Sequence, residues 1–235
     1  MSDKTLFREV FIGRHEELQA LYQRATGAGS TMHGSVILVG ERGVGKTALL
    51  RQLEARLFWK QDRVVPFRYT VNPAILDCAD FARDYLAAFL RHWLAFETRD
   101  EALLFSLGMP LQELAGHAGF RGTAWAREVI ARAQRCADDQ ISLLQNALQA
   151  PVLSALETGK PVAILLDDFP LLAGLRRGGA PASALVSLFN GPVAARQTLY
   201  VLAGMPSAFE ELPLPALTEV PLRTFPPAEA CLLYT

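Results

Sequence analysis

Cysteine is scarce in this chain of 235 residues, and the three that occur, Cys78, Cys136 and Cys231, lie far apart in the sequence. None belongs to a C-x-x-C pair or follows the ligand spacing of a zinc site. The four histidines form no ligand pair either. These absences exclude a disulfide-stapled scaffold and a sequence-evident metal module, and they predict a reducing compartment.

The chain also lacks an excess of charge of either sign, since 23 Lys and Arg balance 24 Asp and Glu for a net charge of −1. A nucleic-acid partner is therefore not supported by net charge, although a local basic patch is left open. No long apolar run is present. The most apolar stretch, YLAAFLRHWLAF, contains Arg91 and His92, and the N-terminal MSDKTLFREVFIG has no signal-peptide core. We expect a cytoplasmic protein with no membrane partner.

What the sequence does contain is a glycine-rich break in an apolar run, SVILVGERGVGKTALLRQLEARL, at residues 35–57. The spacing G-x-x-x-x-G-K-[ST] is that of a P-loop, whose backbone N–H groups surround phosphates at a helix N-terminus. Residues 35–39 predict a buried strand and residues 47–59 a helix. Lys46 is expected to reach the outer phosphates, with a catalytic as well as a binding role, and the Thr47 hydroxyl to bind Mg²⁺. The predicted phosphate-binding residues are Gly40, Gly43, Val44, Gly45, Lys46, Thr47 and Ala48.

A second motif, VAILLDD at residues 162–168, predicts a buried strand that ends in two acids. This is the Walker B pattern, because parallel strands present their carboxyl ends at the edge of the sheet where ligands bind. We expect Asp167 to hold Mg²⁺ through a bound water and Asp168 to polarise the attacking water. An ordinary acidic strand end is the alternative. The two motifs together predict ATP and Mg²⁺ as cofactors.

The remaining sequence predicts an α/β domain. Further strands are expected at residues 63–72, 198–204 and 217–222, and a short helix at 182–190. Residues 74–159 are mainly helical, which is more than a strand-to-strand crossover requires and indicates an insertion. Pro151 is expected to kink or split a helix within this insertion.

The order of four segments resembles AAA+ and STAND-type P-loop ATPases. These segments are FIGRHEELQALYQRA, the P-loop, VAILLDD and TLYVLAG. The resemblance implies a five-stranded parallel sheet of order 5-1-4-3-2 flanked by helices, with the helical insertion between strands 2 and 3. It also implies an ATPase domain at residues 1–222, followed at 223–235 by the start of a truncated C-terminal lid helix. The residues it places near the adenine are Phe11, Ile12, Gly13 and Arg14.

Two departures from that family bear on hydrolysis. The fourth strand ends in Ala203-Gly204-Met205-Pro206, whereas such ATPases usually have a polar sensor residue there; the ending looks more like those of transposition-accessory and secretion-type ATPases. No arginine finger is identifiable. The arginines that could serve a neighbouring subunit, or simply lie on a solvated surface, are Arg176, Arg177 and Arg196.

Three functions remain open from the sequence. The first is a slowly hydrolysing, nucleotide-dependent switch or assembly regulator that acts on a protein partner or by self-association. The second is a P-loop kinase of a small metabolite. The third is a nucleotide-binding interaction module with little hydrolysis. The paired acids and the GRxxEL segment favour the first over the kinase.

Overall fold

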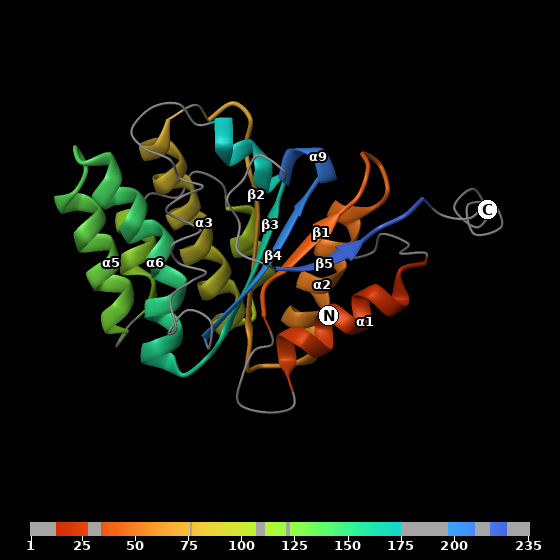
Figure 1. The fold of residues 1–235 in the computed structure, drawn as a ribbon. Coiled ribbons are helices and arrows are strands. Elements are labelled where there is room, and N and C mark those ends of the chain that lie inside the picture. The colour runs from red at the N-terminus through yellow and green to blue at the C-terminus, as the bar shows by residue number, and fades with distance from the viewer. Residues whose placement is uncertain are drawn as a thin grey trace.

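A computed structural model describes residues 13–27, 34–75, 77–106, 111–120, 123–174, 197–209 and 217–224. Within them, one parallel sheet has the strand order β2-β3-β4-β1-β5 (Figure 1). This order, read from the other edge, confirms the predicted 5-1-4-3-2. The strands are β1 (Val36–Val39), β2 (Val65–Thr70), β3 (Val162–Asp167), β4 (Thr198–Gly204) and β5 (Thr218–Pro221).

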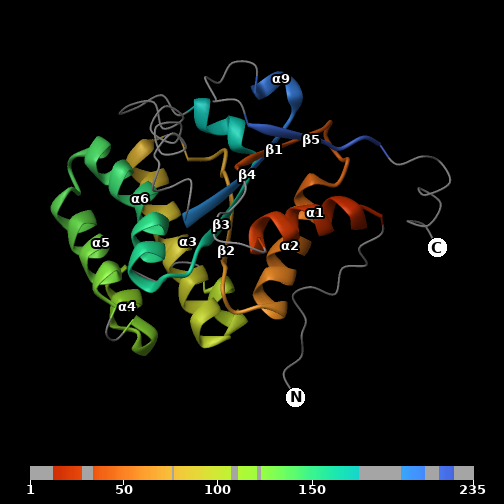
Figure 2. The same ribbon diagram turned by 60° about the horizontal axis from the view of Figure 1, so that its bottom comes forward.

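Helices cover both faces of this sheet (Figures 1 and 2). On one face lie α1 (His15–Thr26) and α2 (Lys46–Lys60). The other face carries α3 (Cys78–Thr98) and α6 (Gln140–Thr158), with α5 (Ala124–Arg135) outside them. The shorter elements are η2 (Glu101–Phe105), α4 (Leu111–Gly116), η3 (Ala118–Phe120), η4 (Phe169–Gly174) and α9 (Pro206–Phe209).

The two helical layers explain why the central strands are apolar throughout. In β3, Val162, Ile164 and Leu166 pack into the core beneath α3 and α6, whereas Ala163 and Leu165 pack on the side of α1 and α2. Successive side chains of a strand point to opposite faces, so a strand buried on both faces has few polar positions, here at the strand ends Asp167 and Thr198. The apolar runs seen in the sequence are therefore the central strands of a covered sheet.

The helical insertion between β2 and β3 is confirmed, and the helix is not split at Pro151. Pro151 lies inside the continuous helix α6, which Asp139 caps at its N-terminus and Gly159, with φ of 69°, ends. Proline removes one backbone donor, yet Pro151 is buried, and packing of α6 against α3 and α5 outweighs the local cost.

Two predicted elements, the short helix at 182–190 and the lid helix at 223–235, lie largely or wholly outside the described residues. The domain boundary at residue 222 accordingly stays a prediction. Across the ranges given above, none of the helices is long and apolar enough to cross a membrane.

Candidate nucleotide-binding site

The loop between β1 and α2 needs glycine at three positions for two different reasons. Gly43 and Gly45 have φ of 85° and 95°, in the left-handed region where a side chain is strained. At Gly40 the constraint is space, because a Cβ there would lie 2.7 Å from the carbonyl oxygen of Leu222 and 2.8 Å from Cγ2 of Val44. The glycine spacing read from the sequence thus corresponds to real backbone constraints.

Helix α2 begins directly at this loop and leaves its N-terminus open. Gly45 is the N-cap residue, and no side chain caps the helix. The first-turn N–H groups of Lys46, Thr47 and Ala48 have no acceptor within the helix, and the helix dipole places partial positive charge at them. An uncapped helix N-terminus behind a glycine loop is suited to a phosphate group.

The Lys46 side chain folds back over the loop. Its Nζ donates to the carbonyl oxygens of Gly40, at 2.6 Å, and Glu41, at 2.8 Å. Burial lowers the pKa of the ammonium, and the nearby carboxylates of Asp167 and Asp168 partly oppose this shift. Lys46 therefore connects the phosphate loop electrostatically with the acid pair that follows β3.

Asp167 ends β3 with a side chain that is only 1% exposed. Its Oδ1 accepts a hydrogen bond from the backbone N–H of Asp168 at 3.1 Å, whereas its Oδ2 is buried without a hydrogen-bond partner among the described residues. A buried carboxylate oxygen without a partner is costly, and a cation or a cation-bound water would satisfy it. The same residues contain no cluster of three His, Cys, Asp or Glu. Mg²⁺ is commonly held by one or two protein oxygens together with substrate phosphates, and the buried Oδ2 of Asp167 is an oxygen that would suit it.

Asp168 occupies a strained turn immediately after β3. Its φ is 51°, a left-handed conformation that few residues other than glycine adopt and that aspartate tolerates better than most. Burial and the adjacent Asp167 raise the pKa of Asp168, while Lys46 and Arg42 act in the opposite direction. The turn leaves this carboxylate exposed at the sheet edge beside Asp167.

Arg14 joins three segments that are distant in the sequence. It is the N-cap residue of α1, with φ of 55°, and its Nη1 lies 3.0 Å from Oε1 of Glu17. Its Nη2 donates to the carbonyl oxygen of Val44 in the P-loop, at 3.4 Å, and to that of Arg223 after β5. Gly13, with φ of 73°, precedes it. The other predicted adenine-contacting residues and the candidate arginine fingers lie outside the described residues; they are Phe11, Ile12, Arg176, Arg177 and Arg196.

Comparison with known proteins identifies the family. A family model described as an AAA ATPase domain matches residues 10–190. The chain belongs to the AAA ATPase domain family, whose members bind ATP. No curated protein matches the sequence.

Solved structures agree with this AAA ATPase domain in fold. The ORC2 protein of Aeropyrum pernix, in its ADPNP–ADP complexes, aligns over 99% of this chain with 16% identity and a TM-score of 0.52. The ADP form of the same protein aligns with 15% identity and a TM-score of 0.48. This chain covers 54% and 55% of those chains, so it spans about half of their length.

The carboxyl end of β4 in this AAA ATPase domain is closed by packing. A Cβ on Gly204 would lie 2.7 Å from Cδ and Cγ of Pro170 and 2.8 Å from Cε2 of Phe209. The rings of Phe169 and Phe209 stack with centroids 6.1 Å apart. The absence of a polar side chain at Gly204 thus has a steric cause, which the sequence does not reveal because Pro170 and Phe209 are distant from one another along the chain.

A buried polar network holds the P-loop helix and was not predicted from the sequence. Glu54 on α2 is 3% exposed, and its carboxylate lies 2.6 Å from Nε of Arg68 on β2 and 3.1 Å from Nε2 of His92 on α3. Burial alone would raise the pKa of Glu54, but the hydrogen bond with His92 and the charge of Arg68 outweigh it and lower the pKa. Glu54 therefore ties α2 to the edge strand of the sheet and to the helical insertion.

Proposed function

We propose that this AAA ATPase domain binds ATP with Mg²⁺ between the P-loop and the acid pair after β3, hydrolyses it slowly, and acts as a nucleotide-dependent switch. The observation that carries the proposal is the position of Lys46. Its ammonium is held by two P-loop carbonyl groups and interacts with the charges of both Asp167 and Asp168. A lysine so placed supports binding of a polyphosphate together with a cation.

In this proposal the loop residues Gly43, Val44 and Gly45 and the first turn of α2 bind the phosphates through backbone N–H groups. Lys46 exchanges its carbonyl acceptors for the outer phosphates. Thr47 would hold Mg²⁺ directly and Asp167 would hold it through a bound water, a role that the buried Oδ2 of Asp167 supports. The metal ion neutralises charge on the phosphates when it is bound.

Hydrolysis is assigned to Asp168, which accepts a hydrogen bond from the attacking water. The packing at Gly204 supports a slow reaction, since it leaves that position without a group that could orient the water. One missing electrostatic contact of this kind costs about 10² or more in rate. We expect turnover by the chain alone to stay well below about one per second, the low end of typical enzyme rates.

The switch role is supported by the contacts of the P-loop with the residues after β5. Arg14 binds the carbonyl groups of both Val44 and Arg223, and Leu222 lies against Gly40. A loop that rearranges around phosphate would therefore alter its contacts with residues 222–224. In this way, binding of phosphate in the P-loop is coupled to the conformation of the residues that follow β5.

The binding proposal is tested by titrating ATP into the wild-type chain and into Lys46→Ala and Thr47→Ala, with Mg²⁺ and with EDTA. We expect Lys46→Ala to remove most of the affinity and Thr47→Ala to weaken binding mainly when Mg²⁺ is present. Lys60→Ala, at the exposed far end of the same helix, is the control and should bind as wild type does. Unchanged affinity in folded Lys46→Ala would refute the assignment, and equal losses for Thr47→Ala in both buffers would remove Thr47 from the metal site.

The packing at Gly204 also favours a second candidate, an interaction module that binds ATP and scarcely hydrolyses it. Steady-state phosphate release separates the two. Slow release that Asp168→Asn abolishes supports the switch, whereas release that Asp168→Asn leaves unchanged supports the binding module.

A further inference from the structure

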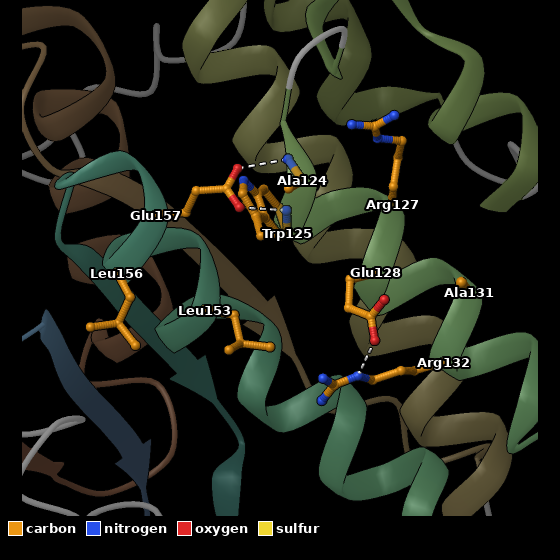
Figure 3. Close-up of a pocket in the computed structure, with 9 residues that line it drawn as sticks. All are labelled: Ala124, Trp125, Arg127, Glu128, Ala131, Arg132, Leu153, Leu156 and Glu157. Atoms are coloured by element: carbon orange, nitrogen blue, oxygen red, sulfur yellow. Dashed lines mark hydrogen bonds and ion pairs between the residues drawn. The ribbon is translucent and has the colours of Figure 1, made fainter.

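A groove runs between α5 and α6 on the outer side of the helical insertion (Figure 3). Its volume is about 820 Å³, and its apolar lining includes Ala124 and Ala131 of α5 and Leu153 and Leu156 of α6. Leu156 is 52% exposed. The groove lies across the sheet from α1 and α2, so it is separate from the nucleotide site (Figures 1 and 2).

The helix that forms one wall of the groove, α6, has no charged residue before Glu157. Helix α6 has no Asp, Glu, Lys or Arg from Gln140 to Leu156, although its outward face includes the exposed side chains of Ile141 and Leu156. The solvent-facing side of a surface helix normally carries charged residues. At the groove itself the exposed apolar side chain is that of Leu156, beside Leu153, and exposed apolar surface of this kind is typical of a site that another molecule covers; Ile141 lies outside the groove.

The other wall, on α5, offers positive charge. Glu128 is shared between Arg132, at 2.7 Å, and Arg135, at 3.3 Å. Arg127 is exposed and makes no hydrogen bond or ion pair within the described part of the chain. Figure 3 shows the Arg132 side chain directed toward α6.

The remaining acid of the groove is already engaged within the fold. Both carboxylate oxygens of Glu157 accept backbone N–H groups at the start of α5, from Ala124 and Trp125, each at 2.7 Å. Glu157 therefore serves as a helix cap. Glu128 offsets the charge of one of its two arginine partners, so the positive charge left for a partner is that of Arg127 and of one of Arg132 and Arg135.

We propose that this groove binds an amphipathic helix of a protein partner. The apolar stripe of that helix covers Leu153 and Leu156, and an acidic flank faces Arg127 and Arg132. The α5 residues that line the groove run from Ala124 to Arg132, about 12 Å along the helix, so the bound segment has at least about two turns. A nucleic acid is disfavoured because the positive charge lies on the α5 wall only. A second copy of this chain is disfavoured because its groove would bring further arginines and no surplus of acidic side chains to face Arg127 and Arg132.

The test uses the full chain and a fluorescent, covalently stapled helical peptide of about twelve residues. The peptide carries leucines along one stripe and glutamates along one flank, and a matched peptide has lysine in place of every glutamate. We expect the acidic peptide to bind about tenfold or more tightly than the basic one, with an affinity that falls as salt is added. Leu156→Ser and Arg127→Glu should each weaken binding about fivefold or more. Ile141→Ser, on the same helix, equally exposed but outside the groove, is the matched control and should bind as wild type does.

Three results would overturn the proposal. Equal affinity for the two peptides would show that the arginines do not select an acidic partner. An unchanged affinity in Leu156→Ser would show that the peptide binds outside the groove. A folded chain that binds an oligonucleotide through Arg127, or that forms a dimer lost in Leu156→Ser, would assign the groove to nucleic acid or to self-association. Because the changed side chains are exposed, we expect the variants to fold, and their thermal unfolding curves check this.

Discussion

Replacing Arg14 by alanine should both weaken nucleotide binding and release the residues after β5. The Arg14 side chain is 10% exposed, and its guanidinium donates to two carbonyl groups, one in the P-loop and one after β5. A hydrogen bond from a charged donor contributes about 1.5–3 kcal/mol. If only the bond to Val44 supports the phosphate-binding form of the loop, about 1.5 kcal/mol is lost, which corresponds to about a tenfold weaker Kd.

The assay separates this role from a contact with the base. ATP and inorganic tripolyphosphate are each titrated into wild type and Arg14→Ala by calorimetry. If Arg14 acts through the P-loop, affinity for both ligands falls by the same factor. If it acts only on adenine, affinity for tripolyphosphate is unchanged. Hydrogen exchange of residues 217–224 is followed in parallel, and we expect it to rise in Arg14→Ala and to respond to ATP only in wild type.

Glu17→Gln is the matched control, because it removes the ion pair of Arg14 and leaves its two carbonyl acceptors. Glutamine keeps a side-chain oxygen that can accept from Arg14, and Glu17 is itself partly open to solvent, so affinity should change less than about fivefold. The reasoning is refuted if Arg14→Ala binds both ligands as wild type does, or if exchange at residues 217–224 in wild type is insensitive to ATP.

Three further substitutions test the physical account of the site. Asp168→Asn should slow hydrolysis and raise Tm at neutral pH, since a raised pKa means that the charged form opposes folding. This gain should vanish as pH falls through the folded-state pKa, and a gain that persists in acid would contradict it. Glu54→Ala should lower the free energy of unfolding by about 2–3 kcal/mol by leaving Arg68 unpaired, and Glu54→Leu combined with Arg68→Met should recover most of it in chemical denaturation. Gly204→Ser, which adds the missing hydroxyl, should cost about 1–3 kcal/mol through overpacking against Pro170; a stable variant with faster turnover would show that packing does not exclude a sensor there.

Much of the fold was predictable because its signals are local. The strand before the P-loop and the strand before Asp167 are runs of apolar residues, as parallel strands covered on both faces require. The P-loop was predictable from spacing alone, since Gly43 and Gly45 take conformations that exclude other residues. The strand order came from resemblance to a family, and the register of the sheet confirms it.

What could not be predicted depends on contacts between distant residues. No spacing relates Arg14 to Arg223, or Glu54 to His92. The alternative that Pro151 splits its helix failed for the converse reason, since the local cost of proline was outweighed by tertiary packing of α6. The roles of individual site residues remain predictions, and those assigned to Phe11 and Ile12 concern residues outside the described ranges.

The packing at the end of β4 connects rate with switching in the proposed function. Pro170 and Phe209 exclude a side chain at Gly204, and the stacked rings of Phe169 and Phe209 fix the segment after the acid pair to the segment after β4. The same contacts therefore hold two loops of the site together and deprive the attacking water of one orienting group. Hydrolysis ends the ATP-bound state of a switch, so a slower reaction lengthens the time during which that state can engage a partner. On this argument, the lack of a polar side chain at Gly204 prolongs the ATP-bound state. A partner that accelerates hydrolysis must then supply the polar group that Gly204 cannot carry.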